Sequence, residues 1–110
     1  MYARVVQLTA KSGQGKELSK IMKERTLPML KQQPGFVDAL GLSSDTEPNQ
    51  FIGISIWKRK EDADKYGSGQ ARLVLESIKP LLDAEPTFRT FNVEASATLG
   101  GGVGLAASSS

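Results

Sequence analysis

Apolar positions alternate in four short segments of the chain and recur at helical spacing in two longer ones. The alternating, β-rich segments are residues 2–10, 36–43, 50–58 and 87–95. Helical spacing covers residues 16–31 and 60–82. The resulting order, β-α-β-β-α-β, is that of the ferredoxin-like split βαβ arrangement in the α+β class. It predicts a four-stranded antiparallel sheet with the helices on one face.

Both helical segments contain residues that interrupt a helix. Pro28 has no N–H to donate and disfavours a helical Leu27, so the first helix is expected to kink or restart there, with Thr26 capping the new turn. The second helix is expected to break at Gly67-Ser68-Gly69 and to bend at Pro80. Each segment is therefore predicted as two pieces.

Acidic residues gather where the second helix begins. Glu61, Asp62 and Asp64 fall in its first turns, where negative charge favours the positive end of the helix dipole. A carboxylate metal site is the alternative interpretation, but acidic residues in a first turn are routine. We expect no metal site.

The third strand is apolar on both of its faces. Ile52, Ile54 and Ile56 form one face. The other face consists of Phe51, Gly53, Ser55 and Trp57. A four-stranded sheet with two helices can bury only one face, so the other needs a further layer. The simplest layer is a second copy of the sheet, which predicts a homodimer through Ile52, Ile54 and Ile56.

The composition of the 110-residue chain removes several kinds of chemistry. It contains no histidine and no cysteine. Disulfides, thiolate nucleophiles, Ser-His-Asp triads and imidazole ligation of zinc or heme are therefore excluded. The residue types left for proton or electron transfer are Tyr, Lys, Arg, Asp, Glu, Ser and the lone Trp57.

The charge pattern favours neither nucleic acid nor membrane as a partner. The formal net charge is +2, and the densest basic cluster, Lys58-Arg59-Lys60, is followed directly by acidic residues. The third strand lacks the basic and aromatic signature of RNA-recognition domains. Because we find no apolar run long enough to span a bilayer and no signal-peptide pattern, we expect a cytoplasmic protein.

The last fifteen residues differ from the rest of the chain. Residues 96–110 are small, uncharged and rich in glycine. Such a composition cannot form a core, so we predict one domain over residues 1–95. The tail is then either a flexible end or an arm that orders on a partner.

Two aromatic residues nine positions apart are candidates for a binding site. Trp57 closes the third strand on the face of Gly53 and Ser55, whose small side chains leave space above the sheet. Tyr66 lies in the helix expected to fold back over that face, so an indole N–H and a phenol O–H would converge on an apolar cavity. The alternative, which is commoner on spacing alone, is that both rings are core residues with satisfied polar tips.

Residues 2–95 resemble the antibiotic biosynthesis monooxygenase (ABM) family of dimeric α+β barrels. The resemblance rests on the element order, on Pro34-Gly35-Phe36 at the start of the second strand, and on residues 51–57 followed by Lys60-Glu61-Asp62-Ala63. It implies a homodimer whose sheets pair face to face into a dimeric α/β barrel. A pocket between the sheet and the helices of each subunit is implied as well.

The resemblance also implies an activity. Characterised members of the family oxidise phenols or quinols with dioxygen and use neither metal nor flavin, so we expect no cofactor and a small aromatic substrate. A separate branch binds and degrades heme, and it needs an Asn on the first strand and a His ligand. Residues 3–7 contain no Asn and the chain contains no His, which argues against heme degradation.

Roles for individual residues follow from the same resemblance. The family's pocket tryptophan matches Trp57, which we expect to stack on the substrate ring. Tyr66 occupies a position that is often His or another aromatic, and we expect it to stabilise a developing oxyanion or to shuttle a proton. The remaining expected binding residues are Ser55, Gly53, Phe51, Met22 and Arg72. The competing hypothesis is a non-catalytic dimeric α+β barrel that binds a small ligand or is associated with stress.

Overall fold

Four strands form one antiparallel sheet in the order β2-β3-β1-β4. The computed structural model describes residues 1–98. Its strands are β1 (Tyr2–Thr9), β2 (Phe36–Ser43), β3 (Gln50–Trp57) and β4 (Thr87–Asn92). The predicted ferredoxin-like α+β fold is therefore confirmed, and β2 has the predicted bounds. The other strands end one to three residues before the ends expected from the sequence.

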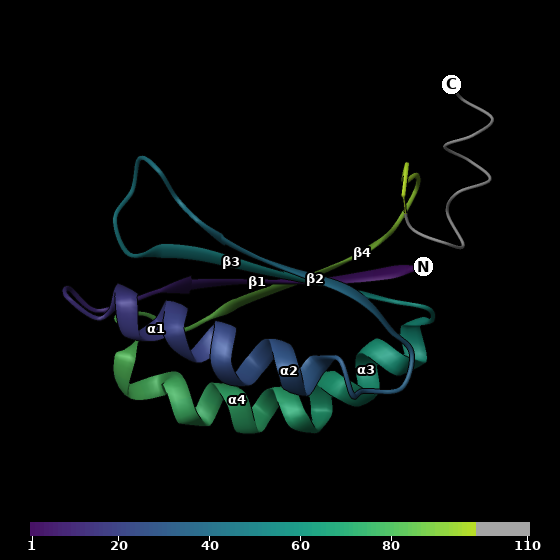
Figure 1. Cartoon of the computed structure of the whole chain (residues 1–110), viewed down its shortest axis with the longest axis horizontal. Helices are drawn as coiled ribbons and strands as arrows, with labels where there is room; N and C mark the ends of the chain where they lie inside the picture. Colours follow the sequence, from purple (N-terminus) through teal and green to yellow (C-terminus); the bar gives the residue numbers. More distant parts are fainter. Residues whose placement is uncertain (99–110) are drawn as a thin grey trace.

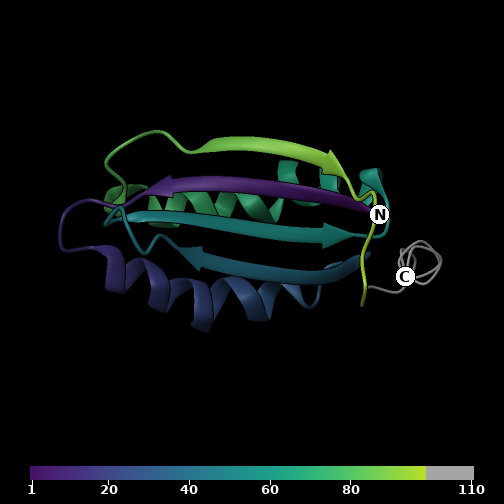
Figure 2. The ribbon, with the colours of Figure 1, turned by 90° about the horizontal axis from the view of Figure 1, so that it is seen from above.

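The helices lie together on one face of this sheet (Figure 1). They are α1 (Gly15–Ile21), a π-helical turn (Met22–Thr26), α2 (Leu27–Leu30), α3 (Lys60–Ser68), α4 (Gln70–Ile78) and a 3-10 turn (Lys79–Leu81). Seen from above, the four strands lie side by side, with α4 behind them and the first helical segment beside β2 (Figure 2). None of the helices within residues 1–98 lies on the opposite face of the sheet.

The first helical segment widens before Pro28 instead of restarting with a cap. The Leu27 N–H donates to the carbonyl of Met22, five residues earlier, which is the bonding pattern of a π-turn. Thr26 has helical backbone angles and makes no side-chain capping bond, so the predicted cap is wrong. Pro28 has no backbone N–H, so interrupting the α-helical hydrogen-bond pattern at this residue costs little. The chain then continues as α2.

The second helical segment breaks where the glycines predicted it would. Gly69 separates α3 from α4 with φ −112° and ψ −101°, a conformation outside the helical region. A Cβ at this position would lie 3.2 Å from the Lys65 carbonyl oxygen, tighter than ordinary packing. Pro80 lies in the 3-10 turn that follows α4, as expected for a bent last turn.

The strand register assigns each side chain to a face of the sheet. Arg4 pairs with Ser55 and Val6 with Gly53, and these residues face the helices. Val5 pairs with Ile54 on the opposite face. The predicted division of β3 into an isoleucine face and a face that ends in Trp57 is therefore confirmed.

The core beneath the helices consists of two separate clusters. The first contains Leu30, Trp57, Ala63, Tyr66 and Ala71. The second contains Ala10, Leu18, Ile78 and Leu82, near the other end of the sheet. The floor between them includes Gly53, which has no side chain to fill the space.

The helix-free face of the sheet is apolar and accessible to solvent. Its register places Ile52, Ile54 and Ile56 of β3 beside residues of β2 and β1. Leu40 and Leu42 of β2 are 55% and 45% exposed. Large apolar side chains are seldom gathered on a free surface without a partner.

Two further expectations concern the end of the chain and the membrane. Most of the predicted tail, residues 99–110, lies outside the described residues, and the domain boundary at residue 95 stays a prediction. Within residues 1–98, the helices are all too short or too polar to cross a bilayer.

Candidate functional site

The two aromatic residues singled out in the sequence stack on each other. The rings of Trp57 and Tyr66 have centroids 5.0 Å apart with an interplanar angle of 28°. Phe36 meets the other side of the indole edge-on, with centroids 5.8 Å apart. Trp57 is fully buried, and its Nε1–H donates to Ser55 Oγ at 2.9 Å. Trp57 thus supports the Tyr66 ring through stacking, and it lines neither of the two cavities between the sheet and the helices.

A cavity of about 110 Å³ lies between the sheet and the helices, on the Gly53 side of Tyr66. Its walls are almost entirely apolar and come from both core clusters. Among the residues proposed from the sequence, Phe51, Gly53, Met22 and Tyr66 line it. A second cavity of about 80 Å³ adjoins it and includes Ser55. Both cavities are lined by Met22, Gly53 and Tyr66, so they are neighbours separated by side chains.

Two glycines face each other across β2 and β3, and one of them, Gly53, lines both cavities. Gly41 pairs with Gly53 in the register of the sheet. The thioether of Met22, from the π-turn, fills the place that a Cβ on Gly41 would take. Since Met is unbranched and adapts to irregular space, Met22 forms a deformable wall. The π-turn also brings Thr26 to the lining of both cavities.

Arg4 is a site residue that the sequence analysis missed. It comes from the middle of β1, and its Cζ lies 5.2 Å from the centroid of the Tyr66 ring. It is the one charged residue, within the described part of the chain, that lines both cavities. The signal was present in the sequence, because Arg4 shares the period-two face of Val6 and Leu8, which point towards the core.

Tyr66 is another polar residue that lines the cavity. Burial raises the pKa of its phenol, and the positive charge of Arg4 opposes this shift. The hydroxyl forms no hydrogen bond with any of residues 1–98, and its oxygen atom is accessible to solvent. Tyr66 therefore stays protonated near neutral pH and has a free donor.

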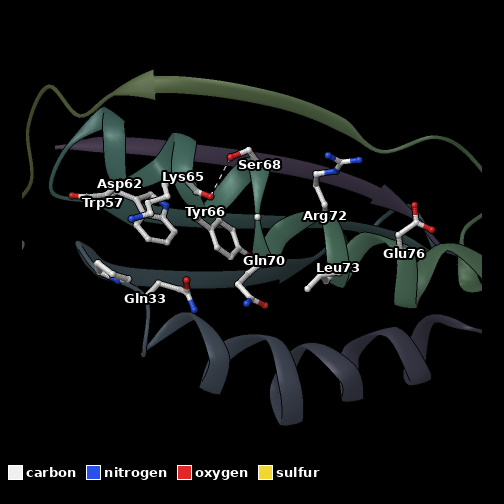
Figure 3. Close-up of a pocket in the computed structure, with 12 residues that line it drawn as sticks. Gln33, Trp57, Asp62, Lys65, Tyr66, Ser68, Gln70, Arg72, Leu73 and Glu76 are labelled. Carbon is white, nitrogen blue, oxygen red and sulfur yellow. Dashed lines mark hydrogen bonds between the residues drawn. The ribbon is translucent and has the colours of Figure 1, made fainter.

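Arg72 faces a different space from the internal cavity. It lines an open cleft of about 550 Å³ whose walls come from Gln33 and Pro34 and from α3 and α4, and which also reaches Trp57 and Tyr66. In Figure 3, Gln70 and Leu73 point from α4 towards the first helical segment, and Arg72 points away from them. Tyr66 is common to the cleft and the cavity, so its ring stands between them.

The acidic residues at the start of α3 have structural contacts. Glu61 and Asp62 lie in its first turn, as expected for charges at a helix start. Asp62 accepts hydrogen bonds from Arg59 at 3.3 Å and packs against Gly35. Nowhere in residues 1–98 do three or more Asp or Glu side chains gather in a way that could hold a metal ion.

Solved structures with the same fold include proteins of known and unknown activity. A protein of unknown function from Nitrosomonas europaea has a TM-score of 0.76 and 22% identity, covering 86% of this chain and 90% of that one. SnoaB, a cofactor-independent oxygenase from Streptomyces nogalater, has a TM-score of 0.73 and 19% identity over 86% and 94%. The heme degrader MhuD from Mycobacterium tuberculosis has a TM-score of 0.72 and 17% identity over 87% and 98%. At these identities the likeness establishes the fold alone.

The sequence itself matches a protein family. Residues 1–74 match the family described as antibiotic biosynthesis monooxygenase. No curated protein matches the chain. The matched segment holds β1 to β3 and α3, and with them Arg4, Met22, Trp57 and Tyr66. The chain belongs to the antibiotic biosynthesis monooxygenase family.

Proposed function

We propose that the protein is a cofactor-independent monooxygenase that oxidises a phenol or hydroquinone with dioxygen in the cavity between sheet and helices. The observation that carries the proposal is the internal cavity itself. It has mostly apolar walls and a few polar side chains, among them Tyr66 and Arg4. Sites for small aromatic ligands have this make-up of mostly apolar walls and a few placed polar groups.

The reaction needs little from the protein beyond positioning and electrostatics. The bound phenol loses a proton, and the electron-rich anion passes one electron to dioxygen. The two radicals combine into a hydroperoxide at a ring carbon, which eliminates water and leaves a quinone. One oxygen atom of dioxygen enters the ring and the other leaves as water, so no external reductant is consumed.

The side chains around the cavity are suited to several steps of this reaction. The apolar walls exclude water, and Trp57 holds the Tyr66 ring in a fixed orientation through stacking. The protonated Tyr66 donates to the oxygen that becomes negative. Met22 is the wall residue that moves to admit a ring, because a cavity of about 110 Å³ is smaller than one that binds benzene, about 150 Å³.

Dioxygen uptake with a panel of phenols and hydroquinones tests this function. We expect at least one member to be consumed faster than its autoxidation, with one labelled atom in the quinone when isotopically labelled dioxygen is used. Protein unfolded in urea serves as the control for autoxidation. Rates equal to autoxidation across the panel, or a quinone without label, would contradict the proposal.

Heme chemistry receives no support from the residues of this chain. MhuD, which has the same fold, was solved with two hemes in its active site. This chain has no histidine to ligate the iron, and its β1 strand reads Tyr2-Ala3-Arg4-Val5-Val6-Gln7-Leu8-Thr9 without an Asn. Of the two activities found on this fold, cofactor-free oxygenation is the one that these residues suit.

A non-catalytic role in ligand binding is the second candidate. Trp57 is fully buried and its N–H already has a partner, so the indole has no free group to offer a substrate. A protein that binds an aromatic ligand without consuming dioxygen would fit this candidate. The uptake experiment, combined with a binding measurement on the same compounds, separates the two.

We also propose that two copies pair through the helix-free face of the sheet. Proteins of the ABM family are typically dimeric. The proposed interface is centred on Ile52, Ile54 and Ile56 and extends over Leu40 and Leu42. Burial of these side chains against a second sheet would remove a large apolar surface from water.

Replacing Ile52 with serine should weaken this dimer. Ile52 is 37% exposed in the single chain, and a two-fold dimer would bury it twice. Since fully burying an isoleucine is worth about 1.5–3 kcal/mol, we expect the dissociation constant to rise about 5- to 50-fold. Sedimentation equilibrium measures the change. Leu73→Ser is the matched control, because Leu73 is 64% exposed on α4, away from the sheet face. A monomeric wild type, or equal effects of the two variants, would refute the proposed interface.

A further inference from the structure

Arg4 is held between two aromatic rings from different parts of the fold. Its Cζ lies 5.2 Å from the ring centroid of Tyr66 on α3 and 5.8 Å from that of Phe88 on β4. The guanidinium also approaches Gly67, where a Cβ would lie only 3.2 Å from one of its terminal nitrogens. These contacts place the guanidinium among Tyr66, Phe88 and Gly67, and none of them is a hydrogen bond that uses its N–H donors.

The charge of Arg4 has no direct counterion in the described chain. None of residues 1–98 accepts a hydrogen bond from Arg4, and no carboxylate lies within ion-pair distance of it. Burial lowers the pKa of Arg4, while Tyr66 and Asp64 act in the opposite direction. An arginine keeps its charge under these conditions, so its five N–H donors remain available. A partly buried charge of this kind favours the arrival of an anion.

Arg4 also lies where an anion attached to a ring would be placed. The cavities of about 110 Å³ and 80 Å³ share Arg4 together with Val6, Met22 and Gly53, and no other charged residue of the described chain lines either one. A ring in the apolar part would meet Met22 and the surface over Gly53. Any oxyanion on that ring would reach Arg4 without leaving the cavity.

We propose that the cavity selects aromatic ligands that carry an ionised oxygen, and that this oxyanion pairs with the guanidinium of Arg4. The inference rests on the cavity of the proposed function and names its ligand class. A bound phenol would release its proton to solvent more readily than the free phenol, because Arg4 stabilises the phenolate. Arg4 would thereby prepare the electron-rich form that dioxygen oxidises.

Binding of para-nitrophenol tests this inference without any turnover, because its phenolate is coloured and its phenol is not. We expect the bound probe to ionise at lower pH than the free probe. Arg4→Gln should abolish this shift and raise the dissociation constant of the phenolate about 10- to 100-fold, the usual effect of losing a hydrogen bond to a charged group. The neutral ether para-nitroanisole should bind both proteins equally. A parallel titration with para-nitrobenzoate distinguishes a carboxylate-preferring site from a phenolate-preferring one.

Two further variants control for poor folding of Arg4→Gln and for a general effect of removing an arginine. Arg4→Lys keeps the charge without the planar fork, so it should retain part of the pH shift even if Arg4→Gln folds poorly. Arg89→Gln is the matched control, because Arg89 stacks on Phe91 with its Cζ at 5.4 Å but faces away from the cavity. Unchanged phenolate binding in Arg4→Gln, or equal losses for the anion and the neutral ether, would overturn the inference. Failure of the dioxygen-uptake experiment would leave it intact, since binding is measured in the absence of turnover.

Discussion

Replacing Trp57 with alanine should lower the free energy of unfolding by about 3–5 kcal/mol, the usual range for removing a large buried aromatic side chain. The indole is fully buried at the end of β3 and contacts both Tyr66 and Phe36. Its loss leaves a void in the first core cluster and removes the surface on which Tyr66 rests. Since small domains are stable by only about 5–15 kcal/mol, this variant should be close to unfolded at moderate urea concentrations.

Circular dichroism is the suitable measurement, because Trp57 is the only tryptophan and the variant loses its fluorescence. Two further variants divide the effect. Trp57→Phe keeps an aromatic ring against Tyr66 and should cost less, whereas Ser55→Ala leaves the indole N–H without its acceptor and should cost about 1–3 kcal/mol. Leu73→Ala, at an exposed helical position, should change stability by less than about 0.5 kcal/mol. A loss below about 1 kcal/mol in Trp57→Ala would contradict the structural role given to this residue.

Replacing Tyr66 with phenylalanine should slow dioxygen uptake by about 10²–10⁴-fold, the usual contribution of a positioned proton donor. The substitution keeps the ring that stacks on Trp57 and removes only the hydroxyl of this cavity-lining residue. Folding should therefore be preserved while the rate falls. The matched control is Tyr2→Phe, which removes the hydroxyl of the chain's other tyrosine, a residue that packs against the same core cluster.

The pH dependence of the rate gives a second measure of the same role. Burial raises the pKa of Tyr66 above the ordinary value for tyrosine, about 10, so the donor form persists to higher pH. The wild-type rate should fall only as pH rises through this raised value. Stability that depends on the protonated phenol is lost over the same alkaline range. Tyr66→Phe should lack this alkaline limb, and a wild-type rate and pH profile in the variant would exclude Tyr66 as the donor.

Local patterns were sufficient to predict the elements and the faces of the sheet. The alternation of Ile52, Ile54 and Ile56 against Gly53, Ser55 and Trp57 predicted the two faces of β3 correctly, because side-chain direction along a strand has a strict period of two. The prediction that Thr26 caps a restarted helix was wrong. A Pro after a helical stretch is compatible with either a new start or a widened turn, and the choice depends on tertiary packing of residues such as Met22.

The site was harder to predict because its parts come together only through the fold. The sequence analysis missed Arg4, and although Arg4 alternates in phase with Val6 and Leu8, the sequence could not show that Tyr66 and Phe88 would lie near it. The direction of Arg72 depended on the backbone at Gly69, whose angles no pattern fixes. The space over Gly53 was predicted from the small side chains of its strand. The position of Gly41 opposite Gly53 depends on the strand register, which the sequence alone does not give.

The π-turn at Met22–Thr26 links the length of the first helical segment to the shape of the cavities that Met22 and Thr26 line. Such a turn holds one more residue than an α-helical turn, so it can originate from a single-residue insertion. A deletion here would restore a regular helix and rotate Met22 and Thr26 relative to the sheet. Insertions and deletions in this helix would therefore change the shape of the cavity. Related proteins with the same strands but a first helix of different length would then bind different ligands.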